Sequence, residues 1–443
     1  MFPFYSHTGR PALNQPQILR SFVLMMDQKC LSVDEWVSRL ASDDLLAFLI
    51  GCSPDSLPPL GSYYDFIDLL WLMNPALEKL GRRDTFPVDK NKKPSFKPSR
   101  GQKLPNKHSG VTKKIADRIR SGRDFPFHYE EALQKLFSLV AVRPSLELGI
   151  IPSGNLTVSG DGTAVHTHAS PFGHKVCHCV KNGIPDCKCP RHFSDPDTST
   201  GWDSDLNSYY YGYTLYMLCC HNKELHTDLP LHIRFLDARR HDSVSGLVAL
   251  AEFRRLNPDI SITNLCLDSA HDNYPTYELC KEWETAPFID LNSNRGRPDS
   301  IPDSLDIDSD GTPLCQAGLR MVNWGYCPDR HSRKWRCPVA TGREEKCPCE
   351  VPCSSSPYGR CIYTKPDWDI RLYTPVPRGT EEYREIYDNR TGSERVNDRI
   401  LNNYHLHDMR IHTKKRYSFF AMIAGINIHL DARLKQAKMA SAA

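Results

Sequence analysis

Three acidic residues stand where they could support a metal-dependent reaction. Asp161 lies in Val-Ser-Gly-Asp-Gly-Thr, between glycines that let a ligand approach the backbone, and Asp268 ends a hydrophobic run. Glu394 is placed among cations that include Arg390 and Arg395. Carboxylates at the ends of neighbouring strands can together hold Mg²⁺, which prefers oxygen ligands. The combination of these acids predicts a site for a divalent cation.

Paired cysteines form a second kind of candidate site. Cys177-His-Cys179 is followed, after seven residues, by Cys187-Lys-Cys189. Soft thiolates at this density suit tetrahedral Zn²⁺, and reduced free thiols are the alternative. A further group lies later in the chain and can also hold zinc, although six cysteines do not identify four ligands: Cys327, Cys337, Cys347, Cys349, Cys353 and Cys361.

The composition is that of a globular protein with a real core. The chain has 443 residues, of which 40% are hydrophobic and 25% charged, and its formal net charge is +3. The first ten residues lack the charged head and apolar run of a secretory signal, and no apolar stretch reaches the length of about 18 residues that a membrane helix needs. We therefore expect a cytoplasmic protein without a membrane partner, whose 17 cysteines are mostly reduced.

Charge is concentrated in one segment of the chain. Residues 90–123 contain twelve cations and a single acid, Asp117, and few large apolar residues. This composition predicts a basic linker over residues 81–127 that cannot fold alone. It also predicts contacts with a phosphate backbone, for which the candidate residues are Lys92, Lys93, Lys113 and Lys114. A solvated linker without DNA contacts is the alternative.

The elements that must position these residues fall into two groups. Residues 1–80 show helical spacing, with a helix through about Leu40, a third helix capped by Ser42 and ending at Gly51, and a fourth opening at Ser62. We interpret them as an all-α module that binds DNA or dimerises, and a small bundle without DNA contact is equally compatible with the pattern.

From residue 128 the pattern becomes α/β. Three consecutive strands are followed by alternating helices and strands, which indicates a mixed sheet flanked by helices. The expected strands are 156–165, 213–219, 231–236, 262–268 and 286–291, and the expected helices are 243–256, 274–283 and one near residue 393. Cys-rich insertions are expected at about 174–201 and 296–380.

One motif resembles a known family. Tyr387-Asp-Asn-Arg390-Thr-Gly-Ser-Glu394 is similar to the Tyr-Arg-Glu signature of bacterial insertion-sequence transposases of the DDE class. Other segments that look like this family are Thr8–Pro11, Ala286–Asn292, Pro357–Arg360 and Pro375–Tyr383. The pattern's lysine, seven residues after the glutamate, is replaced here by Leu401.

The resemblance implies an RNase H-like catalytic domain over residues 128–443. In that family three acids bind two Mg²⁺ or Mn²⁺ ions, and the matching residues are Asp161, Asp268 and Glu394. Tyr387 and Arg390 match the two signature residues before the glutamate, and we expect them and Arg395 to contact DNA.

The expected activity is metal-dependent strand cleavage at the ends of a transposable element, followed by attack of the freed 3′-hydroxyl on target DNA. The expected partner is double-stranded DNA, both element ends and target, so the enzyme would be nucleoid-associated when bound. Pairing two ends implies a homo-oligomer. Two alternatives remain open: an RNase H-like nuclease or domesticated derivative without strand transfer, and a non-catalytic, zinc-stabilised DNA-binding protein.

Overall fold

A computed structural model of the chain describes residues 13–72, 82–83, 110–123, 129–189, 191–293, 295–351 and 353–442. The α-helices are α1 (Gln15–Asp27), α2 (Val33–Leu40), α3 (Asp44–Ile50), α4 (Leu60–Leu69), α6 (Val111–Arg120), α7 (Glu131–Phe137), α8 (Arg143–Glu147), α9 (Asp242–Leu256), α10 (Tyr274–Glu282), α11 (Glu381–Tyr387), α12 (Thr391–Asp398) and α13 (Lys414–Ala442). Two short helical segments near the candidate site are η4 (Ser269–His271) and η7 (Asp388–Arg390).

The strands form three separate sheets. Their bounds are β1 (Arg82–Arg83), β2 (Thr157–His166), β3 (His174–Lys175), β4 (Arg191–His192), β5 (Ser199–Asp203), β6 (Ser208–Asn222), β7 (Thr227–Asp237), β8 (Asn264–Leu267), β9 (Ala286–Ile289), β10 (Val322–Cys327), β11 (Ser332–Arg336) and β12 (Cys361–Thr364).

The largest sheet is mixed and contains six strands. Its order is β5–β6–β2–β8–β9, and β7 also pairs with β6. The β7–β6 and β6–β2 pairs are antiparallel, whereas β2–β8 and β8–β9 are parallel. The long strand β6 is almost continuously buried, which explains its run of apolar residues from Tyr213 to Cys220.

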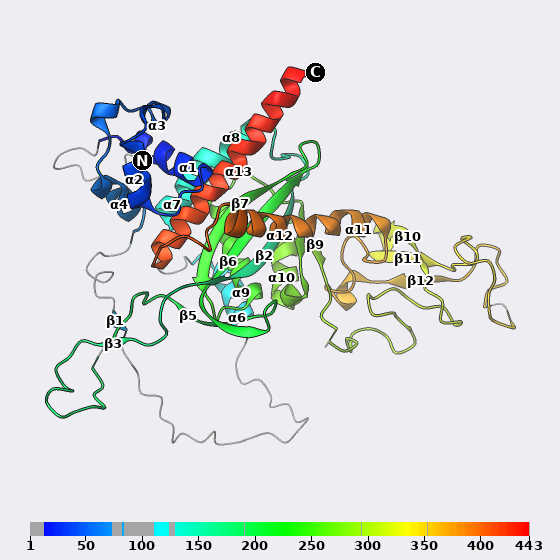
Figure 1. Cartoon of the computed structure of the whole chain (residues 1–443). Helices are drawn as coiled ribbons and strands as arrows, with labels where there is room; N and C mark the ends of the chain where they lie inside the picture. The colour runs from blue at the N-terminus through cyan, green and yellow to red at the C-terminus, as the bar shows by residue number, and fades with distance from the viewer. Residues whose placement is uncertain are drawn as a thin grey trace.

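Helices cover both faces of this sheet (Figure 1). On one face α9 packs against β2, β6 and β7, and α6 packs behind it against α9 and α10. The helix α12 packs against β2, β6 and β7, and α13 against β7. The predicted mixed sheet flanked by helices is therefore confirmed.

The N-terminal helices share their core with the C-terminal helix. Phe22 of α1 is fully buried, and its ring contacts those of Phe419 and Phe420 in α13 at centroid distances of 4.7 and 5.8 Å. The side chain of Asn427 donates a hydrogen bond to the carbonyl of Val23 at 3.0 Å. Helices α1–α4 are thus anchored to the α/β part through α13.

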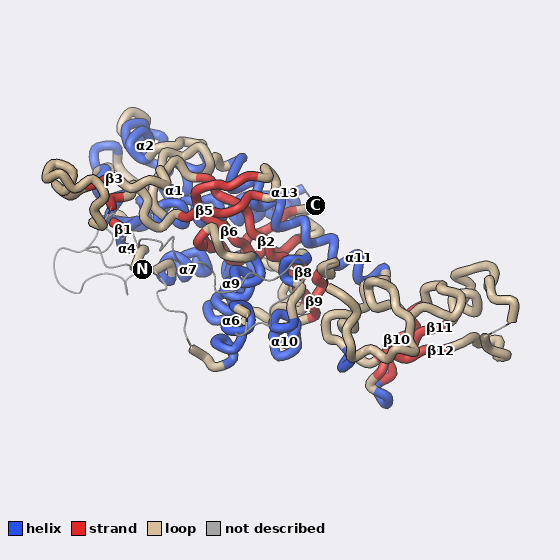
Figure 2. Tube along the Cα trace, turned by 90° about the horizontal axis from the view of Figure 1, so that it is seen from below, coloured by secondary structure: helices blue, strands red, loops and turns tan. Residues whose placement is uncertain are grey.

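The second Cys-rich insertion leaves the main sheet between β9 and α11. Its strands form an antiparallel sheet in the order β10–β11–β12. In both views this sheet lies at the end of the molecule remote from α1–α4 (Figures 1 and 2). The third, small sheet has the order β1–β4–β3 and belongs to the first Cys-rich insertion.

Several elements differ from the sequence predictions. The N-cap of α3 is Asp43, whose carboxylate accepts from the backbone N–H of Leu45 at 3.0 Å, so Ser42 is not the cap. The helix α4 begins at Leu60, before Ser62. Both differences are shifts of one or two residues, at helix ends where several capping arrangements compete.

Part of the predicted basic linker is a helix. In α6 the side chain of Ala116 is fully buried against Leu247 and Leu279. The cation Arg120 contacts Glu282 at 2.7 Å and Glu278 at 2.9 Å. The composition indicates a segment that cannot fold by itself. Residues 111–120 form a helix here because they pack on α9 and α10.

The length and the apolar character of a helix determine whether it could span a membrane. In the part of the chain that the structure describes, no helix has both the length and the apolar character that spanning a bilayer requires.

Candidate active site

The strand β2 places Asp161 near the middle of the main sheet. Because side chains alternate between the two faces of a strand, Asp161 points away from the face to which Gly160 and Gly162 belong. A Cβ atom on Gly160 would lie 2.7 Å from the hydroxyl of Tyr216 and 2.9 Å from Leu267. The flanking glycines are therefore required by close packing on the face of α9.

Asp268 is brought beside Asp161 by the strand register. Ser159 of β2 is paired with Cys266 of the parallel strand β8, so the positions two residues further along are Asp161 and Asp268. Because neighbouring strands lie about 4.8 Å apart, this register directs Asp161 and Asp268, which follows the last residue of β8, toward the same place. More than a hundred residues separate them in the sequence, and only the pairing of β2 with β8 joins them.

Burial and the charges of neighbouring acids act on the pKa values of both carboxylates. Burial together with the negative charges of Asp268 and Asp242 raises the pKa of Asp161 to about 7. Burial would also raise the pKa of Asp268, but hydrogen bonds from His271 and Ala270 and the charge of Arg390 lower it. One neighbouring acid is thus held ionised while the other resists ionisation, a pattern common at functional sites.

His271 holds Asp268 in place. Its Nδ1 lies 2.5 Å from the Asp268 carboxylate, and its Nε2 lies 2.9 Å from the hydroxyl of Tyr216. Since an ionised carboxylate can only accept, Nδ1 donates to it, and Nε2 forms the second hydrogen bond with the Tyr216 hydroxyl. Because His271 is buried at 1% exposure, it positions Asp268 in this structure.

Asp242 is a residue near this site that sequence reasoning missed. It begins α9, which follows β7 after a connection of residues 238–241, and its carboxylate lies against Gly162. Burial raises its pKa, with a further contribution from the charge of Asp268. The strands β7 and β2 are both antiparallel to β6 and hence parallel to each other, so the start of α9 lies at the edge where β2 and β8 end. A signal existed: an acid directly before the predicted helix 243–256.

Glu394 lies on α12, which packs against β2. Its carboxylate is 2.8 Å from the guanidinium of Arg390, and its side chain is 49% exposed. The charge of Arg390 acts in turn on Asp161 and Asp268. The structure therefore places all three predicted acids around one arginine.

The three acids are not all within coordination distance of one another. Within the described ranges, only one group of three or more His, Cys, Asp or Glu side chains has ligand atoms that all lie within 4.8 Å, and it consists of cysteines. Glu394 is instead paired with Arg390, and this ion pair engages a carboxylate oxygen that a metal would need.

The other predicted DNA-contacting residues are distributed as follows. The ring of Tyr387 is half-buried and stacks on Tyr383 at 5.8 Å, while Arg395 contacts Asp228 through two nitrogens at 2.6 and 3.0 Å. On α6, Lys113 lies 3.2 Å from Asp117 and Lys114 is exposed. Lys92 and Lys93 lie outside the described residues.

The first cysteine cluster forms as predicted. The four Sγ atoms of Cys177, Cys179, Cys187 and Cys189 lie within 4.8 Å of one another, so this cluster can hold a structural metal such as zinc. Hydrogen bonds from the Cys179 backbone and the Cys187 thiol lower the pKa of Cys177 to about 7. Hydrogen bonds with Cys189 and Cys177 raise the pKa of Cys179 to about 12, and the pKa of Cys189 is also raised, so these two thiols of the cluster do not share the shift of Cys177.

The second cysteine group does not converge in the same way. Its six members are half-buried free thiols, and no three of them, as far as the described part of the chain goes, meet the 4.8 Å distance. Neighbouring cysteines nevertheless affect Cys349. A hydrogen bond with Cys347 raises the pKa of the Cys349 thiol, and the charges of Cys353 and the buried Cys315 raise this pKa further. The prediction of a second zinc site stays a prediction.

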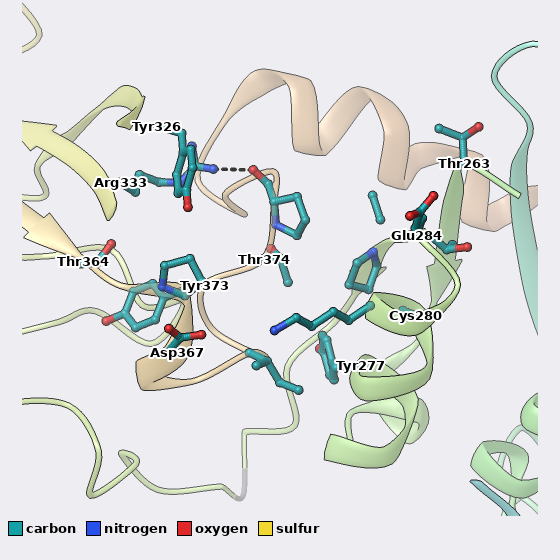
Figure 3. A pocket seen from close by; sticks show the side chains of 17 residues that line it. Thr263, Tyr277, Cys280, Glu284, Tyr326, Arg333, Thr364, Asp367, Tyr373 and Thr374 are labelled. Carbon is teal, nitrogen blue, oxygen red and sulfur yellow. Dashed lines mark hydrogen bonds between the residues drawn. The ribbon is translucent and has the colours of Figure 1, made fainter. Parts of the chain in front are cut away.

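A separate cavity of about 630 Å³ lies between α10 and the second insertion (Figure 3). Arg333 of β11 reaches across its rim and donates a hydrogen bond to the carbonyl of Pro375. Thr263, Thr285 and Ala286 line it from the amino-terminal ends of β8 and β9, whereas Asp268 follows the carboxyl end of β8. The cavity is therefore distinct from the acidic site.

Comparisons with known proteins do not assign a family. No protein-family model matches the chain, and no curated protein matches it.

Proposed function

We propose that the chain is a DNA transposase of the DDE class, which cleaves strands at element ends and joins the 3′-hydroxyl to target DNA. One observation carries the proposal: the register of the parallel strands β2 and β8 directs Asp161 and Asp268 toward the same place, and burial together with the negative charges of Asp268 and Asp242 raises the pKa of Asp161 to about 7. Neighbouring carboxylates repel each other, so placing them together costs free energy unless a cation binds between them. Such an arrangement is expected at a site where a metal ion binds a phosphodiester.

The topology supports the finer assignment of an RNase H-like fold. The strands β2, β6 and β7 form an antiparallel part of the main sheet, in which β6 pairs with both β2 and β7, and β8 and β9 continue the sheet as strands parallel to β2. This arrangement agrees with the mixed sheet expected from the sequence. It puts Asp161 on β2, Asp268 directly after β8, and Glu394 on α12, which packs against β2.

The donor set fits Mg²⁺ or Mn²⁺ in part. Asp161 and Asp268 offer hard oxygen donors side by side, and Glu394 could join them by exchanging its ion pair with Arg390. A pair of bound ions would neutralise charge on the attacking and leaving oxygens of a phosphodiester. The neighbouring residues prepare this site: His271 orients Asp268, and the packing of Tyr216 against Gly160 fixes β2.

Arg390 has a second task in this proposal. Its guanidinium lies 2.8 Å from the Glu394 carboxylate, and its charge also acts on Asp161 and Asp268. If Glu394 held a metal instead, the guanidinium would be free to donate two hydrogen bonds to a DNA phosphate. The all-α module α1–α4 and the basic residues Lys92 and Lys93 would contribute DNA binding outside the catalytic site.

The test uses a supercoiled plasmid that carries the DNA flanking both sides of the coding region, a second plasmid as target, and Mg²⁺ or Mn²⁺. We expect cut ends and joined products with the full chain, and neither with Asp161→Asn, Asp268→Asn or Glu394→Gln. The exposed Asp259, which is paired with Arg143, supplies the matched control Asp259→Asn, which should act like the wild type.

The outcomes separate the alternatives. Cutting without joining would indicate the nuclease, and DNA binding that neither metal converts to cutting would indicate the non-catalytic protein. Undiminished cutting by the Asp161 or Asp268 variant would remove that residue from the site.

A further inference from the structure

The loop between β3 and β4 contains four sulfur atoms arranged as metal ligands. The Sγ atoms of Cys177 and Cys187 lie 3.4 Å apart, and those of Cys179 and Cys189 lie 3.6 Å apart. A tetrahedral zinc with Zn–S bonds of about 2.3 Å separates its sulfurs by about 3.8 Å. A disulfide needs about 2.05 Å, so the spacing is that of ligands around a common centre.

The chain topology explains why the four sulfurs meet. Cys177 follows β3 after one residue, and Cys189 precedes β4 by one residue, so the two Cys-x-Cys pairs lie on opposite arms of a hairpin. The turn between the arms is closed by backbone hydrogen bonds, including that of the Ile184 N–H to the Cys179 carbonyl at 2.8 Å. Each arm thus supplies two ligands.

The described residues of this loop form no hydrophobic core that could stabilise it. Their large apolar side chains are on the surface, with exposures of 44% for Val176 and 54% for both Val180 and Ile184. Burial of apolar area is the main source of folding free energy, and a segment without it needs another source. Metal–thiolate bonds supply such a source in small modules that are unfolded without metal.

The charges around the cluster suit a bound tetrathiolate. Four thiolates with Zn²⁺ carry a net charge of −2, and the loop residues between β3 and β4 or on them include four cations and a single acid, Asp186. The cations are Lys175, Lys181, Lys188 and Arg191. Soft thiolate ligands in a tetrahedral set select zinc or iron over Mg²⁺.

We propose that Cys177, Cys179, Cys187 and Cys189 bind one Zn²⁺, and that this ion holds the β3–β4 hairpin on which β1 pairs. The backbone of Arg83 in β1 is paired with Arg191 of β4, and Lys175 of β3 is paired with Arg191 from the other side. The metal-bound hairpin therefore ties the start of the predicted linker, residues 81–127, to the α/β part. This inference does not depend on the proposed catalytic function.

The test compares the metal content of the full chain, purified with reductant, with that of Cys177→Ser/Cys189→Ser. We expect the wild type to contain one more equivalent of zinc than this variant, and Co²⁺ exchanged into it to show thiolate-to-cobalt charge-transfer absorption. The matched control is Cys347→Ser/Cys349→Ser, which removes a Cys-x-Cys pair of equal spacing from the other insertion. It should retain the equivalent that the first variant loses.

A second measurement uses the unmodified chain, so that misfolding of a variant cannot imitate the result. We expect a zinc chelator to open the loop to a lysine-specific protease at Lys175, Lys181 and Lys188, while the chain from β6 to α10 stays intact. Equal metal content in the wild type and Cys177→Ser/Cys189→Ser, iron in place of zinc, or cleavage unaffected by the chelator would overturn the proposal. Because no arm measures DNA cleavage, a failure here is distinct from a failure of the transposase assignment.

Discussion

Replacing Asp161 by asparagine should make the protein more stable at alkaline pH while abolishing cleavage. The folded-state pKa of Asp161 is raised from 3.8 to about 7 by burial and by the charges of Asp268 and Asp242. A raised carboxyl pKa means that the folded state resists ionisation, so stability is complete below pH 3.8 and falls as the pH rises through 7. Asparagine cannot ionise, so the variant should not lose this stability as the pH rises.

The size of the effect follows from the same shift. At about 1.4 kcal/mol for each pKa unit, the ionisation of Asp161 costs the wild type about 1.7 kcal/mol at pH 5 and about 4 kcal/mol at pH 8. Urea denaturation of both proteins, without divalent cations, at these two pH values measures the difference. The gain of Asp161→Asn over the wild type should grow by about 2 to 3 kcal/mol between pH 5 and pH 8.

The control for this experiment is Asp259→Asn. Asp259 is exposed, and the hydrogen bond from Arg143 lowers its pKa, so removing its charge should bring no gain at pH 8. If Asp161→Asn were less stable than the wild type at pH 8, or if its advantage did not change with pH, the inferred burial of Asp161 beside other carboxylates would be wrong.

Three further predictions concern the acidic site, the N-terminal helices and the basic segment. Tyr216→Phe removes the hydroxyl that is hydrogen-bonded to Nε2 of His271 and should lower the free energy of unfolding by about 1–3 kcal/mol. Urea denaturation measures this loss, and an unchanged midpoint would contradict the prediction. Phe22→Ala should cost about 3–5 kcal/mol and melt the N-terminal helices together with the C-terminal helix, and two separate transitions in calorimetry would show that they are independent. Lys92→Gln/Lys93→Gln should lower the slope of log affinity against log salt by about 0.9 for each DNA phosphate that the variant no longer neutralises, and an equal slope would assign these lysines to solvent.

Sequence patterns predicted the strands around the acids well. The run ending at Asp268 is apolar because β8 is buried on both faces, and this character is visible without a structure. The helix 243–256 was also predicted within one residue of its observed start. The neighbourhood of Asp161 and Asp268, however, depends on the register of two strands separated by more than a hundred residues, which no local pattern reports.

The long helix α13 was not predicted, for a physical reason. From Tyr417 to His429 every side chain is buried, since the helix lies between α1 and β7. A helix buried on all sides has no polar face, and the periodicity that reveals amphipathic helices is absent.

The two cysteine groups show how far spacing can be used. Two Cys-x-Cys pairs ten residues apart match a hairpin whose arms face each other, and the four sulfurs converge. The six later cysteines are spread over a sheet and long loops, where spacing does not determine which side chains meet. Contacts between such loops are set by tertiary packing.

The most direct measurement is the binding of Mn²⁺, followed by the electron paramagnetic resonance signal of the free ion, to zinc-loaded protein. We predict that the wild type removes Mn²⁺ from solution, that Glu394→Gln does so more weakly, and that Asp161→Asn/Asp268→Asn does not. Equal uptake by the wild type and the double variant would contradict the assignment of these carboxylates to a catalytic cation.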